Sequence, residues 1–553
     1  MKLRATDDVL ETPYLPLLPI RDLTVALAPA RKGVIDVGFS TTLPLTVPID
    51  WNRPEETDPT FWNRIHQLGF LIPQVVNVKG RGEAWEDDLH TVTAVLQDWI
   101  AAHPQDVSGD KVVWTGHPTA VRTMIMAGMA GIVADVPAWL LKALTGHVSW
   151  LKANYSGHWN HGLLENIALL AGSQVTGQID MTIALARIDA CVREVVDEQG
   201  AVNEQAVSYA PVVKNLLSTL ASMYEVAKVD IPEPFDRRHR IARFIEAATQ
   251  PDGMLVPIGD SLTTRGAIDH GPTASNARRI EVFDRGYIFG RDPWGEGTFF
   301  SLRFGEGRRI HGHRDHTSVT WFCRGRETLV EAGFGGYAAD RWRSYERMEA
   351  GHNQVTIRTG TYQWQAKTDL VAIFSDEIGG WDSMTLSDMP YPRTERSRSI
   401  LFHHRGGFVA VVDHLTVDED RAWKFDQTWH LHESLVPHVH RRTDGGRVRF
   451  VRDDGSGIAI HQLAGDPYIE SVVGRQDPLA GFRSQGFLDR IAVPHVTSTL
   501  VGNACTFVTV ICDEPTMLST VAAEEEGATI KTERGSFEVT FSTNSDLLIA
   551  HPM

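Results

Sequence analysis

The sequence predicts an α+β protein of two domains, with helices in its first half and antiparallel β-strands in its second. The chain has 553 residues, which is longer than a domain with a single hydrophobic core usually is. From about residue 84 to residue 250, apolar residues recur every three or four positions, which is the period of an amphipathic helix. After about residue 275, apolar and polar residues alternate in short runs that are separated by turn residues, which indicates antiparallel strands. Helices followed by strands favour two packed domains over β-α-β winding.

The first helical run is expected over residues 85–103, where Leu89, Val92 and Leu96 are spaced by three or four positions. Short connections rich in Gly, Pro, Asp or Ser separate the runs that follow. We expect these further helices near 118–131, 135–151, 160–173, 176–198, 204–227 and 237–249. Successive helices with short links form antiparallel hairpins, and enough of them can close into an α/α toroid. Residues 1–255 are assigned to this toroid.

The second domain is expected to be an antiparallel β-sandwich over residues 276–553. Its clearest strands are predicted at 281–290, 298–304, 317–322, 400–403, 408–412, 506–511 and 537–541. Between the two domains, residues 256–275 are rich in Gly, Pro and Asp and are predicted to be a linker.

Composition and charge exclude several classes of partner. The chain has 53 basic and 70 acidic residues and a formal net charge of −17, which argues against binding nucleic acid. No apolar run approaches the roughly 18 residues of a membrane helix, so no membrane partner is expected. The N-terminal segment is acidic where a secretion signal would be apolar, which favours the cytoplasm. The cysteines do not suggest a disulfide framework and are expected to be buried thiols: Cys191, Cys323, Cys505 and Cys512.

The segment HGHRDH, residues 311–316, places three histidines and a carboxylate close together. Such crowding is typical of metal binding or proton transfer. As HxHxDH it is compatible with the zinc site of a metallo-β-lactamase-type hydrolase. As an HxH on a β-strand, with His352-Asn353 farther on, it is compatible with one half of a lyase site. The following residues alternate and turn at Arg324-Gly325, as in a hairpin, which favours the lyase. In a third interpretation the histidines only satisfy one another.

The surrounding motifs resemble those of the heparinase II/III-like polysaccharide lyases, a superfamily that joins an α/α toroid to antiparallel sheets. In that family an HxH leads into a hairpin, an aromatic-rich loop and a His-Asn pair. The matching segments here are HGHRDHTSVTWFCRGRETLVEAGFGGY and RWRSYERMEAGHNQV. Further segments fit in the expected order: IDWNRPEETDPTFWNRIHQLGFL, WTGHPTAVRTM, SGHWNHGLLENIALLAG, DEQGAVNEQAVSYAPVV, IGDS and QTWHLH. The resemblance therefore covers most of the chain.

The resemblance implies a set of catalytic residues. Tyr209 would act as an acid, and also as a base where cationic neighbours lower its pKa from about 10. His311 would be its partner acid or base. Asn160 and His161 would hold the carboxylate of the substrate. Simpler interpretations are that Asn160 is the N-cap of the following helix and that Tyr209 is part of an amphipathic face.

The resemblance also implies a divalent metal, with zinc expected, bound by His313, Glu331 and His352. In relatives this site lies beside the catalytic centre and is chiefly structural. The family usually has Asp where this chain has Glu331, whose longer side chain changes the geometry, so the presence and identity of the metal stay open. In some relatives the equivalent histidine contacts substrate instead, so His352 is also a weaker candidate for substrate binding.

Other candidates for substrate binding are weaker, because packing or exposure explains each of them as well. Tyr345 is a second candidate acid. Positive groups or stacking rings for an anionic sugar are Arg240 and Trp159, together with Arg122, Arg309, Arg314 and Trp364. Asp315 and His316 are expected to support the strand.

Together these expectations describe a lyase that cleaves a uronic-acid-containing glycan or oligosaccharide by β-elimination. A base removes the proton at C5, the C4 oxygen leaves, and a 4,5-unsaturated uronate remains. The site must neutralise the sugar carboxylate, for which Asn and His donors are suited. The expected partner is thus an anionic glycan, and a homo-oligomer is possible. The alternatives are a metal-dependent hydrolase using HxHxDH and a glycan-binding relative without catalysis.

Overall fold

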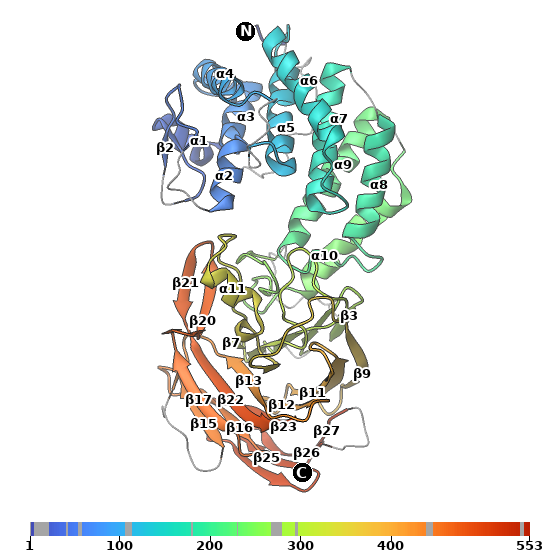
Figure 1. Ribbon diagram of the computed structural model, residues 1–553, viewed down its shortest axis with the longest axis vertical. Helices are drawn as coiled ribbons and strands as arrows, with labels where there is room; N and C mark the ends of the chain where they lie inside the picture. The colour runs from blue at the N-terminus through green and yellow to red at the C-terminus, as the bar shows by residue number, and fades with distance from the viewer. Residues whose placement is uncertain are drawn as a thin grey trace. The chain divides into compact units, whose positions relative to one another are not determined.

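The computed structural model describes residues 2–4, 22–39, 42–52, 58–105, 113–177, 181–228, 230–266, 279–292, 297–437, 446–541 and 547–553. These form two compact units (Figure 1). The helical unit comprises Met1–Asp197, Val212–His239 and Gly336–Ala339. The β-unit comprises Glu198–Pro211, Arg240–Gly335 and Asp340–Met553. The chain therefore passes between the units several times. The boundaries predicted from the sequence, with a linker at 256–275, stay a prediction, and 267–275 lie outside the described residues.

The helical unit is an α/α toroid, as the spacing of apolar residues predicted. The predicted helices are α4 (Trp85–Ala102), α5 (Gly116–Ile132), α6 (Ala138–Ala153), α7 (Asn160–Thr176), α8 (Met181–Val195), α9 (Tyr209–Ala227) and α10 (Arg237–Ala247). Elements that we did not predict are α1 (Leu23–Arg31), β1 (Val34–Ile35), β2 (Leu43–Pro44), α2 (Pro59–His66), η2 (Gly69–Leu71), α3 (Ile72–Gly80) and η3 (Glu233–Asp236). Helices α9 and α10 each pass from one unit into the other along the chain.

Helix α5 is the centre of the toroid's core. It packs against α3, α6 and α7, and every residue from Pro118 to its end is buried. Among them is Arg122, whose Nη1 donates to the carbonyl oxygen of His66 at 2.6 Å while the guanidinium lies 4.0 Å from the Trp99 ring centroid. A fully buried arginine must be satisfied in this way. Arg122 therefore has a role in packing within this unit.

The β-unit consists of antiparallel sheets. The five-stranded sheet contains β3 (Ile280–Phe283), β4 (Tyr287–Arg291), β5 (Phe299–Arg303), β6 (Val319–Cys323) and β7 (Arg326–Leu329). The eight-stranded sheet has the order β14 (Val436–Pro437), β15 (Arg447–Val451), β16 (Gly457–Gln462), β23 (Ala504–Glu514), β12 (Phe408–Val417), β11 (Thr394–His403), β10 (Trp381–Asp388) and β9 (Thr368–Asp376).

Two smaller sheets have four strands each. They are β17 (Tyr468–Val473), β22 (Pro494–Gly502), β13 (Trp423–His430) and β8 (Val355–Ile357), and β24 (Thr520–Glu524), β25 (Gly527–Thr532), β26 (Gly535–Thr540) and β27 (Ile549–Pro552). The remaining elements are the hairpins β18 (Arg475–Gln476) with β19 (Leu479–Ala480) and β20 (Phe482–Gly486) with β21 (Asp489–Ala492), and the helices α11 (Arg341–Arg347) and η4 (Glu349–Gly351).

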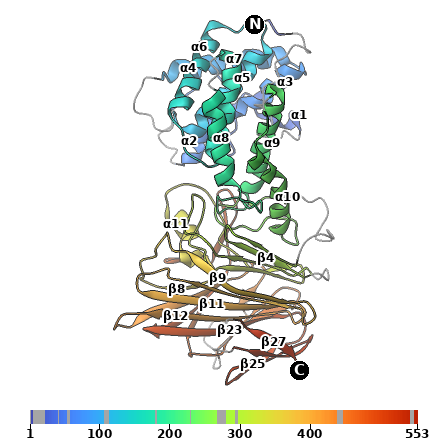
Figure 2. The same cartoon turned by 90° about the vertical axis from the view of Figure 1, so that its right-hand side faces the viewer.

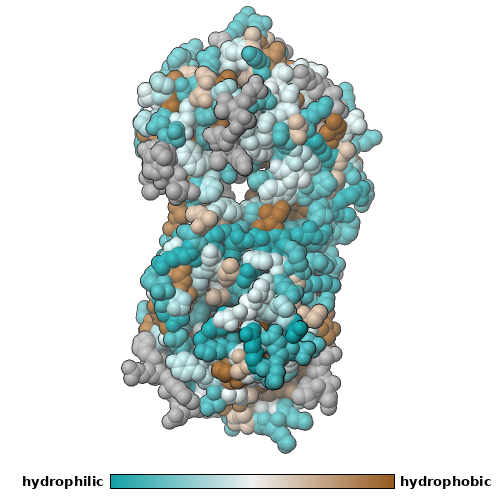
Figure 3. All heavy atoms as spheres, viewed as in Figure 1, coloured by the Kyte–Doolittle hydropathy of each residue, from teal (hydrophilic) through white to brown (hydrophobic). Residues whose placement is uncertain are grey.

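The sheets stack as layers, which confirms the predicted sandwich (Figure 2). One face of the eight-stranded sheet packs on the five-stranded sheet, where the rings of Phe300 and Phe402 stack at 3.9 Å. The other face packs on β24–β27 through residues such as Phe408 and Ile530. Burying each such side chain contributes about 1.5–3 kcal/mol. The side of the molecule in Figure 3 is mainly hydrophilic, as expected when apolar side chains fill the cores.

Two arginines of β11 tie the loops of the β-unit to its core. Arg398 is fully buried against Asp413, and its Nη1 also donates to the carbonyl oxygens of Thr317 at 2.8 Å and Asn353 at 2.6 Å. Arg396 pairs in the same way with Asp388. Because a buried ion pair must be fully hydrogen-bonded to be tolerated, these arginines hold the 311–318 and 352–355 segments in fixed positions.

The prediction that the HxH lies on a β-strand is wrong. Residues 311–316 lie in the connection between β5 and β6, although the hairpin β6–β7 that follows is confirmed. The backbone of this connection bonds to other loops instead of a ladder: His311 N donates to the Glu204 carbonyl oxygen at 3.2 Å, and Asp260 N donates to the His311 carbonyl oxygen at 2.9 Å. The loops approach so closely that a Cβ at Gly312 would lie 2.1 Å from Gln205 Oε1.

The start of α9 and the state of the cysteines were also predicted from the sequence. Helix α9 begins at Tyr209 and not at 204, because the preceding segment packs in the β-unit and Gln205 has a φ of 56°, which a helix cannot include. The four cysteines are free and buried, as predicted. Within the described ranges, no helix is both long enough and apolar enough to cross a membrane.

Candidate active site

The predicted catalytic histidine is held by a buried carboxylate of the β-unit. Asp260 Oδ2 lies 3.1 Å from His311 Nδ1, and Asp260 Oδ1 lies 2.8 Å from His313 Nε2. The guanidinium of Arg343 donates two hydrogen bonds to the same carboxylate, at 2.5 and 2.7 Å. His311 and His313 thus converge on Asp260, although they lie in a loop where strand alternation cannot align them.

The charge of Asp260 fixes the proton positions on His311. Burial alone would raise the pKa of Asp260, but its hydrogen bonds with His311, His313 and Arg343 hold this pKa well below the usual range. An ionised carboxylate only accepts hydrogen bonds, so His311 Nδ1 must carry a hydrogen. In the neutral imidazole Nε2 of His311 is then the accepting nitrogen.

Tyr209 lies directly against this histidine. Its ring stacks on the ring of His311 with centroids 4.1 Å apart and an interplanar angle of 19°. Glu204, on the same segment as Tyr209, places Oε2 3.7 Å from His311 Nε2. The ring of Tyr209 is partly exposed, whereas His311 is 6% and Glu204 1% exposed. The β-unit therefore brings a phenol and an imidazole together beside two carboxylates, which is a set suited to acid–base chemistry.

The residues of the predicted metal site lie near one another but are paired differently. The rings of His313 and His352 have centroids 5.4 Å apart. His352 Nδ1 bonds to Glu331 Oε2, and Ser318 donates to the other oxygen of Glu331. His352 Nε2 is buried without a hydrogen-bond partner, which is a feature compatible with a metal ligand. Across the described ranges, no three His, Cys, Asp or Glu side chains are grouped to hold a metal ion, so metal binding stays a prediction.

The remaining members of HGHRDH separate from His311 and His313. His316 Nδ1 lies 3.1 Å from Thr368 Oγ1, and burial lowers the pKa of His316 to about 4. Asp315 faces Arg303, at 3.6 Å. The arrangement does not gather these side chains with His311 and His313, as a hydrolytic HxHxDH site would require.

The predicted carboxylate-binding residues belong to the helical unit. Trp159 occupies the N-cap position of α7, so Asn160 is the first helical residue and capping does not account for it. Asn160 is 6% exposed. The ring of His161 stacks on Trp159 with centroids 3.9 Å apart and lies 5.0 Å from the ring of His117. Asn160, His161 and Trp159 thus form one group at the start of α7.

Two weaker candidates have partners within the β-unit. Tyr345, on α11, is buried with its hydroxyl 2.9 Å from His430 Nε2, and burial raises its pKa well above the ordinary value. Arg240 Nη1 donates to the carbonyl oxygen of Glu198 at 2.5 Å and is half exposed, at 53%. These contacts explain both residues by packing or local structure, and binding of substrate by them stays a prediction.

Sequence reasoning did not assign a role to Asp260 or Arg343. Both lie in segments that resemble the family: Asp260 in IGDS and Arg343 in RWRSYERMEAGHNQV. Neither segment by itself indicates which histidine its charge would contact, because the contacts join positions far apart in the chain.

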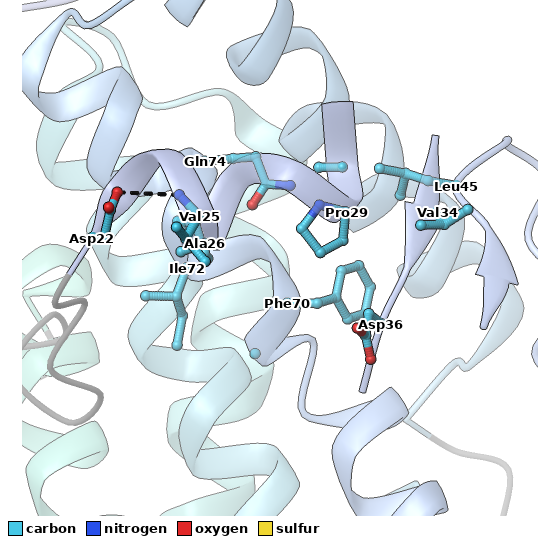
Figure 4. Close-up of a pocket in the computed structure, with 13 residues that line it drawn as sticks. Asp22, Val25, Ala26, Pro29, Val34, Asp36, Leu45, Phe70, Ile72 and Gln74 are labelled. Carbon is cyan, nitrogen blue, oxygen red and sulfur yellow. Dashed lines mark hydrogen bonds between the residues drawn. The ribbon is translucent and has the colours of Figure 1, made fainter. Parts of the chain in front are cut away.

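A pocket of about 500 Å³ lies elsewhere, within the helical unit (Figure 4). Helices α1 and α3 contribute most of its lining, which is largely apolar. None of the predicted site residues lines it.

Comparisons with known proteins agree with this fold. Residues 286–486 match the family model described as Heparinase II/III-like, C-terminal. No curated protein sequence matches the chain.

Three solved structures share the architecture. The structure titled heparan sulfate lyase HepC from Pedobacter heparinus is 15% identical with a TM-score of 0.65, the one titled Heparinase III is 14% identical with 0.77, and the Heparinase III-BT4657 gene product is 15% identical with 0.67. Each match covers 99% of this chain and 93% of the other. At such identities the likeness shows the fold, and the family model agrees with the resemblance of the motifs within residues 286–486. Residues 286–486 are therefore similar to the heparinase II/III-like C-terminal domain, and over nearly its whole length the chain has the toroid and β-sandwich fold of the heparinase III structures.

Proposed function

We propose that this protein is a polysaccharide lyase that cleaves a uronate-containing glycan by β-elimination. The observation that carries the proposal is the stacked pair of Tyr209 and His311, with His311 fixed by the buried charge of Asp260. The family model and the shared fold support the same class of reaction, because the structures of this fold include one titled heparan sulfate lyase.

In the proposed reaction Nε2 of His311 accepts the proton from C5 of the uronate. The electron pair of the C–H bond forms the C4–C5 double bond as the C4–O bond breaks. The phenol of Tyr209, stacked beside the imidazole, donates its proton to the leaving oxygen. Asp260 remains ionised throughout and accepts the hydrogen bond from Nδ1 of His311, which keeps Nε2 as the accepting nitrogen.

Asn160 and His161 are proposed to neutralise the carboxylate of the sugar. This step is needed because the C5 proton is only weakly acidic beside a carboxylate that already carries a negative charge. The support is the resemblance of the segment around them to the Asn-His segment of the family, and the grouping of His161 with Trp159 at the start of α7.

A panel of uronic polysaccharides followed by ultraviolet absorbance tests the proposal, since the new double bond absorbs and the product of hydrolysis does not. The panel includes heparan-, chondroitin- and hyaluronan-type chains and alginate. Tyr209→Phe should lower the rate roughly 10²–10⁴-fold by removing the acid. Tyr468→Phe is the matched control, because Tyr468 is 60% exposed on β17 and belongs to no predicted site.

Two outcomes would contradict the proposal. Release of sugars without a gain in absorbance would indicate a hydrolase. Binding of a glycan with no turnover, unchanged by Tyr209→Phe, would indicate a glycan-binding protein.

A further inference from the structure

Three arginines of the β-unit gather around one tryptophan beside the candidate active site. Arg308 and Arg314 lie in the connection between β5 and β6, and Arg347 ends helix α11. Their guanidinium carbons lie 4.8, 4.0 and 5.4 Å, respectively, from the ring centroid of Trp364. A cation over an aromatic face is attracted to it, so Trp364 is a platform that orders the guanidinium groups. We call Arg308, Arg314, Arg347 and Trp364 the arginine cluster.

Among the described residues, a carboxylate lies within ion-pair distance of one of these three arginines. Arg314 pairs with Glu349 at 3.0 Å. Within the described ranges, the side chain of Arg308 donates to backbone oxygens, those of Gly312 at 2.8 Å and Ile310 at 3.2 Å. For Arg347 the part of the chain that the structure describes supplies no carboxylate within ion-pair distance, and its Nε is buried without a hydrogen-bond partner. The imbalance stands out in a chain whose formal net charge is −17.

The neighbouring positive charges act on the pKa of Arg347. Burial and the neighbouring charges of Arg308, Arg343 and Arg314 lower its pKa to about 10, and the opposing effect of Asp260 does not compensate. Holding like charges together costs free energy. A bound anion would remove this cost.

The cluster is also held in place by its backbone. Arg308 N donates to the Trp364 carbonyl oxygen at 2.7 Å, and Arg314 N donates to the Arg347 carbonyl oxygen at 3.0 Å. A Cβ at Gly307 would lie 2.5 Å from the backbone of Gln365, so the two loops are in close contact. The guanidinium groups therefore need little rearrangement to bind an anion.

The position of the cluster relates it to the candidate catalytic histidine. Arg308 bonds to Gly312, the residue between His311 and His313. Asp260, which holds His311, acts electrostatically on both Arg308 and Arg347. A group bound by the cluster would thus lie close to a sugar that reacts at His311.

We propose that Arg308, Arg314 and Arg347 form a subsite for an oxyanion, either a sulfate or a carboxylate, on a sugar neighbouring the one that is cleaved. The guanidinium group is planar and donates paired hydrogen bonds that match such groups. The proposal rests on the proposed lyase function and adds a determinant of which glycan is preferred.

The experiment compares Arg347→Gln and Arg308→Gln with the unaltered enzyme on matched substrates: a sulfated heparan-type oligosaccharide and the same oligosaccharide after desulfation. Each variant should raise KM about tenfold or more, with a smaller change in kcat, because the variant cannot form one charge-assisted hydrogen bond to the bound substrate. Arg421→Gln is the matched control. Arg421 likewise lies over a tryptophan, 3.5 Å from the Trp423 ring centroid, but it is 60% exposed and pairs with Glu419.

The two sources of the anion give different results. A KM effect confined to the sulfated substrate supports a sulfate subsite, and an equal effect on both substrates supports a carboxylate subsite. If neither variant changes KM more than Arg421→Gln does, the proposal is overturned. Should Arg347→Gln not fold, Arg347→Lys retains the charge while losing the paired donors and should give an intermediate KM.

Binding is also measured without turnover, so that failure of the lyase function can be recognised separately. The sulfated oligosaccharide should raise the Tm of the Tyr209→Phe protein. In the double variant that carries both Tyr209→Phe and Arg347→Gln, this rise in Tm should be smaller. A Tm shift that depends on Arg347 supports the subsite even if no glycan is eliminated. A shift identical with and without Arg347→Gln overturns the subsite.

Discussion

Replacing Asp260 by asparagine should separate the positioning of His311 from the stability of the fold. The carboxylate accepts hydrogen bonds from His311, His313 and, twice, from Arg343, at 2.5 to 3.1 Å. An amide has one accepting oxygen, and its nitrogen would face a donor. At least two charge-assisted bonds are then lost, at about 1.5–3 kcal/mol each, which gives a destabilisation of about 3–6 kcal/mol. This agrees with the cost of about 3–5 kcal/mol for leaving one partner of a buried ion pair alone.

The effect on catalysis should exceed what stability explains. Without the carboxylate, Nδ1 of His311 is no longer required to carry the hydrogen, so the ring can adopt the tautomer in which Nε2 does not accept. We expect kcat to fall roughly 10²–10⁴-fold under conditions where the variant is folded. The assay combines ultraviolet absorbance for activity, thermal unfolding for stability, and nitrogen NMR of the His311 ring for its tautomer.

Asp382→Asn is the matched control. Asp382 is also buried, accepts from His404 Nε2 at 2.7 Å and pairs with Arg279 at 2.9 Å, but it contacts no candidate site residue. It should lose similar stability and keep its kcat. Wild-type kcat in folded Asp260→Asn protein, or an equal loss of kcat in both variants, would refute the reasoning.

The same carboxylate has a predictable dependence on pH. Its pKa in the folded protein is depressed, so its stabilising contribution is fully present above the unfolded pKa of about 3.9 and is lost as the pH falls below that value. In Asp260→Asn this part of the acid sensitivity should be absent when free energies of unfolding are measured by urea titration between pH 5 and pH 3.

Three further predictions concern other parts of the molecule. Arg398→Ala should destabilise the protein by about 3–5 kcal/mol, because it leaves Asp413 buried without its partner and frees the loops that Arg398 holds. Denaturant unfolding measures this destabilisation, and a value below about 1 kcal/mol would contradict the prediction. Burial lowers the pKa of His147 to about 3 and the pKa of His495 to about 4. The contribution of each neutral histidine to stability is therefore complete above the unfolded pKa of about 6.5 and falls by about 1.4 kcal/mol per pH unit below it. The Tm should accordingly decrease between pH 6.5 and pH 4, and it should decrease less steeply in His495→Gln. Elemental analysis should detect a divalent metal, zinc being expected, that is removed in His352→Ala; active protein without bound metal would rule the metal site out.

The helices and strands could largely be predicted from the sequence, because burial of one face imposes a period that is local. Trp85–Ala102 and the β6–β7 hairpin are examples. The short helices α1, α2 and α3 were missed, since eight or nine residues give too few repeats to establish a period. The prediction failed most clearly at residues 311–316, where the backbone bonds to Glu204 and Asp260 override the alternating pattern.

The sequence by itself determined the class of fold and which residue types were available for acid–base chemistry, because hydrophobic period and motif spacing are properties of neighbouring positions. It also pointed to Tyr209 and His311, which the structure stacks at 4.1 Å. Only the tertiary structure decided that Asp260 and Arg343 fix His311, and that Arg347 lies with Arg308 and Arg314 over Trp364. These features depend on contacts between loops distant in the chain. Charge, hydrogen bonding and burial act through space, so their balance exists only once the loops have been brought together.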